Sequence, residues 1–121
     1  MTLELRGTNL RHFIIGEARK RDWISIAELI QAAEQQGFSV AGRPSKAISD
    51  ALRWEVRRDR IRKLERGEYR IGSIPRTSER RIDERLQMLK VAVERGMTLD
   101  DLKQNPGYFV GGADEEEDEV W

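Results

Sequence analysis

The stretch GRPSKAISDALRWEVRRDRIRKLERGEYRIG, residues 42–72, decides the fold because a helical pattern passes directly into a strand-like one. Pro44 opens the helical part, and proline suits the first position of a helix because its missing N–H would have no partner there. Apolar residues then recur at helical spacing: Ile48, Ala51, Leu52 and Val56. These features predict an amphipathic helix over 44–60 with one face packed on a core.

The second part of the stretch has the pattern of a short β-hairpin. Two runs, 61–64 and 68–71, flank the loop Glu65-Arg66-Gly67, whose glycine supplies the left-handed conformation of a three-residue turn. The resulting register pairs Ile61 with Ile71 and Lys63 with Tyr69, so these four side chains share one face. We expect the two isoleucines to close the core.

Basic residues are concentrated in this same stretch. The chain has no net formal charge, yet residues 43–70 hold ten basic and five acidic side chains, whereas residues 71–121 hold seven and twelve. Such charge asymmetry indicates a polyanionic partner, an acidic tail or both. The alternative is an ordinary well-solvated surface that is rich in arginine and glutamate. A helix with a cationic face followed by a cationic hairpin suits double-stranded DNA. The candidate DNA contacts are Arg43, Ser45, Lys46, Ser49, Arg53, Arg57, Arg60, Arg62, Lys63, Arg66 and Arg70.

Two helices are predicted upstream. The first begins at Thr8 or Asn9 and ends near Lys20, after a lead-in over residues 1–8 without a defined structure. After the short extended piece Trp23-Ile24, Ser25 and Glu28 form a capping box that starts a second helix. Gly37 ends this helix, and residues 38–42 form a turn.

In the order of these elements, residues 8–72 resemble the winged helix-turn-helix family. The resemblance makes 25–36 the support helix, 44–60 the recognition helix and 61–71 the wing, with Trp23-Ile24 as a third small strand. It implies DNA binding most often, and RNA or protein binding in some members. The expected fold class is therefore mainly α with a small β-hairpin (α+β): a winged helix-turn-helix with an added C-terminal helix.

The C-terminal part, residues 73–110, is expected to form that helical extension. A helix from Ser78 to Gly96 carries an apolar seam that suits either a homodimer or packing on its own domain: Ile82, Leu86, Leu89 and Val93. A short second helix starts at Thr98. The acidic tail, 111–121, ends in Trp121. It is expected to be a disordered solubilising segment, a docking peptide for a protein partner, or an autoinhibitory segment that lies over the chain's own arginine-rich surface and competes with DNA.

Catalytic, metal-binding and cofactor chemistry has no support in the sequence. There is no cysteine, and His12, the single histidine, is expected at a surface or boundary position. No apolar run reaches the roughly 18 residues of a membrane span, and no secretory signal is evident. We therefore expect a cytoplasmic, nucleoid-associated protein of bacterial or phage type, a transcription regulator or DNA organiser. The alternative is a winged-helix protein–protein interaction module.

Overall fold

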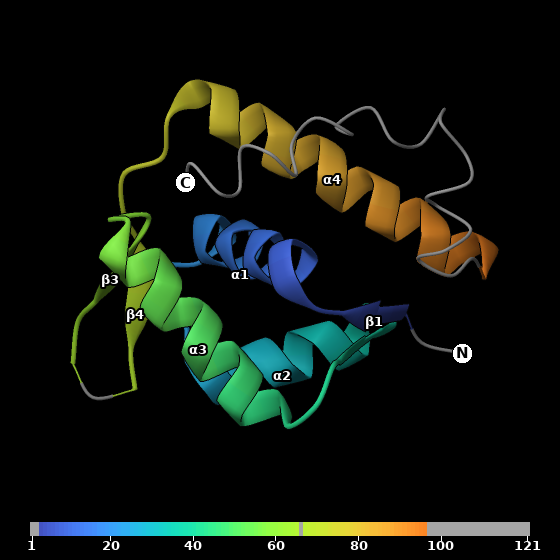
Figure 1. Cartoon of the computed structure of the whole chain (residues 1–121), viewed down its shortest axis with the longest axis horizontal. Helices are drawn as coiled ribbons and strands as arrows, with labels where there is room; N and C mark the ends of the chain where they lie inside the picture. The colour runs from blue at the N-terminus through green and yellow to red at the C-terminus, as the bar shows by residue number, and fades with distance from the viewer. Residues whose placement is uncertain (1–2, 66, 97–121) are drawn as a thin grey trace.

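The computed structural model describes residues 3–65 and 67–96. Within these ranges the chain is mainly helical with small strands, as expected. Its elements are β1 (Leu3–Leu5), α1 (Gly7–Lys20), α2 (Ile26–Gln35), β2 (Phe38–Val40), α3 (Pro44–Arg57), β3 (Ile61–Lys63), β4 (Tyr69–Ile71) and α4 (Arg76–Arg95). In Figure 1, α1 occupies the centre, with α4 on one side of it and α2 and α3 on the other. The expected helix after Thr98 and the acidic tail lie outside the described residues.

The hairpin of β3 and β4 confirms the predicted register. Ile61 pairs with Ile71 and Lys63 with Tyr69, and Gly67 has the left-handed conformation that the loop requires, with a φ of +78°. The extended piece before α2 joins this hairpin, because Ile24 and Tyr69 exchange two backbone hydrogen bonds, of 2.7 and 2.9 Å. Ile24 thus ties the start of α2 to the hairpin.

A second, parallel pair of strands was missed from the sequence. β1 pairs with β2 in the register Leu3 to Phe38 and Leu5 to Val40. The expectations of an undefined lead-in over 1–8 and of a turn over 38–42 are therefore wrong. Each strand is three residues long, which is too short for alternation to be distinguished from chance, and burial of Leu3, Leu5 and Phe38 is what stabilises the pair.

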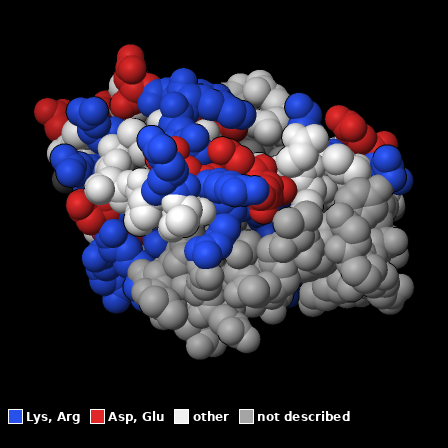
Figure 2. Space-filling view, turned by 90° about the horizontal axis from the view of Figure 1, so that it is seen from above, with Lys and Arg blue, Asp and Glu red and all other residues white. Residues whose placement is uncertain are grey.

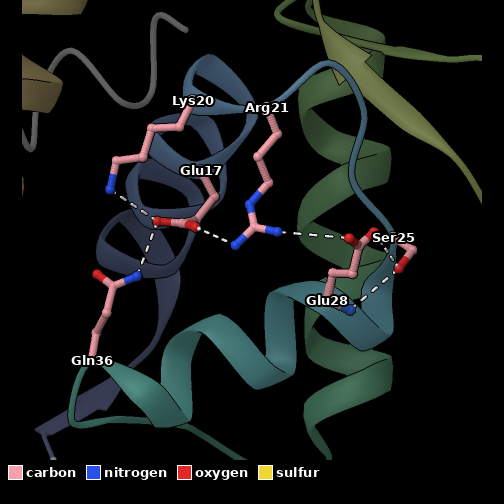
Figure 3. Close-up of polar contacts among 6 residues, drawn as sticks. All are labelled: Glu17, Lys20, Arg21, Ser25, Glu28 and Gln36. Atoms are coloured by element: carbon pink, nitrogen blue, oxygen red, sulfur yellow. Dashed lines mark hydrogen bonds and ion pairs between the residues drawn. The ribbon is translucent and has the colours of Figure 1, made fainter.

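A polar network fixes α2 against α1 (Figure 3). The Ser25 hydroxyl caps α2 by accepting a hydrogen bond from the Glu28 backbone N–H at 3.2 Å, which confirms the predicted cap. At the end of α1, the buried Glu17 carboxylate accepts hydrogen bonds from Lys20 (3.2 Å), Arg21 (3.4 Å) and Gln36 (3.1 Å). Arg21 also lies 3.6 Å from Glu28. Because these contacts reach both ends of α2, they set its angle to α1.

Helix α4 packs on its own domain, so the predicted dimer seam is wrong at two of its four positions, Ile82 and Leu89. Ile82 and Leu89 are fully buried in the same core as α1. The helices approach closely at Gly16, where a Cβ atom would lie 2.5 Å from Leu86 Cδ1. Apolar residues have the same spacing in a short dimer seam as in a helix that faces its own core. A pattern of about two heptads therefore could not tell a dimer helix from a core helix.

The two remaining seam residues, Leu86 and Val93, are half-buried. With Phe13 and Phe38 they line a groove of about 610 Å³ between α4, α1 and β2. The helix ends as predicted, at Gly96, but begins at Arg76 instead of Ser78.

Candidate nucleic-acid interface

Helix α3 presents a narrow polar stripe to solvent. Lys46, Asp50, Arg53 and Arg57 follow one another at spacings of four, three and four residues, and all four are exposed. The opposite face buries Ile48, Ala51 and Leu52. A helix repeats about every 3.6 residues, so this spacing keeps the three cations in one row along the outer surface.

Asp50 interrupts the cationic row and was not among the residues singled out from the sequence. Its carboxylate lies 2.9 Å from Lys46 Nζ and 3.9 Å from Arg53 Nη1. The hydrogen bond from Lys46 lowers the pKa of Asp50, so the carboxylate is ionised at neutral pH. The sequence spacing, four residues after Lys46 and three before Arg53, is the signal that identifies such a pair.

The other candidates at the start of α3 are at the edge of this stripe. Arg43 is the exposed N-cap residue, and Ser45 in the first turn is also exposed. Ser49 is half-buried, on the flank of the stripe. All three are near the row of cations, but Ser49 has the least access to an external partner.

Arg60 is a correction to the sequence prediction. α3 ends at Arg57, and Asp59 adopts a left-handed conformation with a φ of +61°, which turns the chain back. Arg60 is consequently buried, and its Nε donates a hydrogen bond to Glu55 at 2.5 Å. The prediction assumed a continuous helix to residue 60, which would have placed Arg60 in line with Arg53 and Arg57. That assumption was wrong.

A buried charged cluster joins α3 to α1 below the stripe. Burial raises the pKa of Glu55, against the opposing hydrogen bond from Arg60, and Arg11 Nε lies 3.7 Å from the same carboxylate. His12, expected at a surface or boundary, is 1% exposed. Burial, together with the charges of Arg85, Arg11 and Arg60, lowers the pKa of His12 to about 3. His12 is therefore a neutral part of the core.

Trp54 borders this cluster, at the edge of the core. Its ring is half-buried and lies near three guanidinium groups, with Arg58 at 4.3 Å from the ring centroid, Arg11 at 5.0 Å and Arg57 at 6.0 Å. These cation–π contacts orient the last turn of α3, where Arg57 is exposed.

The hairpin adds three exposed cations next to α3. Arg62 and Arg70 are cross-strand partners on the outward face, and Lys63 is also exposed although it shares the register face of the core isoleucines. Arg62 Nε lies 3.7 Å from Asp59. Arg66, the candidate at the hairpin tip, is outside the described residues.

The face formed by α4 is different in character. Figure 2 looks onto it from above and shows basic and acidic side chains next to each other. The ion pairs include Arg19 with Asp83 at 2.7 Å and with Glu79 at 3.5 Å, and Arg80 with Glu84 at 3.2 Å. On this side Arg19 and Arg80 are thus paired with nearby carboxylates.

No family model, curated protein or solved structure matches this chain. Over residues 3–65 and 67–96, no cluster of histidine and carboxylate side chains suits a metal ion. Within the same ranges, every helix is too short or too polar to cross a membrane. The exposed surface of α3 and the hairpin therefore bears most directly on function.

Proposed function

We propose that this protein binds double-stranded DNA through the outer stripe of α3 and the adjacent hairpin. The observation that carries the proposal is the excess of exposed positive charge. Within the described part of residues 43–70, seven basic side chains are exposed against three acidic ones, Asp50, Asp59 and Glu65. The exposed cations are Arg43, Lys46, Arg53, Arg57, Arg62, Lys63 and Arg70.

The dimensions of α3 suit a major groove. Its 14 residues give a length of about 21 Å, and a groove about 12 Å wide admits an α-helix. Arg53 and Arg57 are one turn apart on the outward stripe, where an inserted helix meets base edges. Arg62 and Arg70 then lie beside the helix and contact phosphates, which contribute affinity but little sequence preference.

The order of elements supports a winged helix-turn-helix as the framework for this contact. α2 precedes α3, the hairpin follows it, and Ile24 adds the short third strand to β4. We propose a role in transcription regulation or DNA organisation on this basis. A dimer through α4 is not part of the proposal, because Ile82 and Leu89 belong to the core of the domain.

The test compares two double variants that remove the same charge. Arg53→Ala/Arg57→Ala changes the α3 stripe, and Arg80→Ala/Lys90→Ala changes two exposed cations of α4. At about 1–3 kcal/mol per good base contact, the first variant should lose about 30-fold or more in affinity for a bound duplex. The second should lose little. Equal losses in both variants, with folding intact by circular dichroism, would show that the stripe has no special role.

A further inference from the structure

The hairpin and the adjoining Trp23-Ile24 have a face that points away from the core. This face carries side chains that the proposed duplex contact does not explain. Two large apolar side chains stand out as exposed in the described part of the chain, Trp23 at 46% and Leu64 at 47%. Leu64 follows β3, and its backbone N–H donates to Glu68 across the hairpin at 2.9 Å. Trp23 directly precedes Ile24, which is paired with Tyr69 and fully buried.

Register brings Trp23 into line with two arginines. Ile24 opposes Tyr69 in an antiparallel bridge, so Trp23 lies opposite Arg70, and Arg70 in turn pairs with Arg62. Successive side chains of an extended chain point to opposite faces, and Ile24 points into the core. Trp23, Arg70 and Arg62 therefore form one row on the outward face, with cross-strand neighbours about 5 Å apart.

The row combines an aromatic surface with two cations. Arg62 and Arg70 are exposed, and the cation–π contacts found among the described residues all involve Trp54. The Trp23 ring therefore has no cation stacked on it in that part of the chain. An aromatic ring stacks on any base, because every base has a π face, while neighbouring arginines bind the phosphates of the same strand.

We propose that this row binds an unpaired nucleotide of a DNA strand that continues from the duplex held by α3. A base stacks on Trp23 while Arg70 and Arg62 contact the flanking phosphates. Paired bases in a duplex keep their faces stacked on each other, so an exposed ring is of use for an unpaired base. The inference rests on the proposed function, since Arg62 and Arg70 belong to both surfaces.

Nucleic acid fits this face better than a protein does. Its two apolar side chains are separated by the arginine pair, whereas the buried centre of a protein interface is depleted in charged residues. The face is also continuous with the cationic surface of the hairpin. We therefore expect the protein to prefer a duplex with a single-stranded tail to a blunt duplex of the same sequence.

The experiment measures the affinity of the full chain for a blunt duplex and for the same duplex with a single-stranded tail. The variants are Trp23→Ala, Trp23→Phe, which keeps an aromatic ring, and Arg53→Ala/Arg57→Ala. Wild type should bind the tailed duplex more tightly, by about 5- to 150-fold for one stacked base. Trp23→Ala should lose this preference and bind the blunt duplex as wild type does. Trp23→Phe should retain part of it.

Two results would overturn the inference. One is a wild type that does not distinguish tailed from blunt duplex, as expected if the face docks a protein. The other is a Trp23→Ala variant that keeps the full preference, or weakens both duplexes equally. Either result leaves the proposed function standing if blunt-duplex binding still depends on Arg53 and Arg57. The proposed function fails separately if Arg53→Ala/Arg57→Ala binds the blunt duplex as tightly as wild type.

Discussion

Truncation of Leu89 separates a core role of α4 from a role in dimerisation. Leu89 is fully buried in the core that α1 also forms, so Leu89→Ala should remove apolar contacts and leave a cavity. Such substitutions cost about 2–5 kcal/mol. For a domain of this size each kcal/mol lowers the melting temperature by roughly 4–8 °C, so the variant should melt at least about 8 °C below wild type.

The assay is a thermal melt followed by circular dichroism at two protein concentrations tenfold apart. Gln87→Ala, at an exposed position of the same helix, is the matched control and should melt with wild type. A core role predicts a large loss at Leu89 that does not depend on concentration. If α4 were a dimer seam, the wild-type melting temperature would itself rise with concentration. A Leu89→Ala variant that melts within about 2 °C of wild type would refute the argument.

Three further predictions concern charges. Glu55→Gln removes the carboxylate that is paired with the buried Arg60 and should cost about 3–5 kcal/mol in urea unfolding, whereas Glu34→Gln at an exposed position should cost little. His12 has a folded pKa of about 3 against 6.5 ordinarily, so the unfolded chain binds a proton that the native state does not, and stability falls as pH drops below 6.5. Between pH 6 and 5, His12→Asn should reduce the slope of the free energy of unfolding against pH by an amount that approaches about 1.4 kcal/mol per pH unit. Identical slopes in wild type and His12→Asn would contradict the burial of a neutral imidazole. Asp50→Asn frees two stripe cations, Lys46 and Arg53, and should tighten duplex binding in anisotropy titrations at low salt. The gain in affinity should shrink by roughly threefold for each added phosphate contact when the salt is raised from 50 to 200 mM. A variant that binds no more tightly than wild type at 50 mM salt would contradict this prediction.

Local signals in the sequence were sufficient for much of the framework. The register of the hairpin followed from the position of Gly67, because a three-residue loop with a left-handed glycine allows little choice of pairing. The start of α2 followed from the Ser25 cap, and Gly96 marked the end of α4. In each case one residue with a strong conformational preference fixed a boundary.

Contacts between distant segments were not accessible in the same way. Pairing of β1 with β2 depends on burial of short segments that have no turn between them. The apolar residues of α4 were recognised in the sequence. Their spacing did not show whether a second copy of the chain or the chain's own domain covers them. Arg60 is not part of the cationic stripe, because the helix ends three residues before the predicted end. The chain turns there through Asp59, and no proline or glycine in the sequence marks this turn. Most of the candidate interface is unaffected by this change, since Arg53, Arg57, Arg62 and Arg70 are exposed.

The salt dependence of duplex binding tests the central claim most directly. Seven exposed cations on α3 and the hairpin are available to displace counterions from DNA. If about five of them contact phosphates, the slope of log K against log salt is about −4.5, and affinity falls on the order of 500-fold between 50 and 200 mM salt. We expect a linear plot with this slope, and a slope about two units shallower in Arg62→Ala/Arg70→Ala, which loses two phosphate contacts. A protein that does not bind duplex DNA at 50 mM salt, or binds it with a slope near zero, would contradict the account.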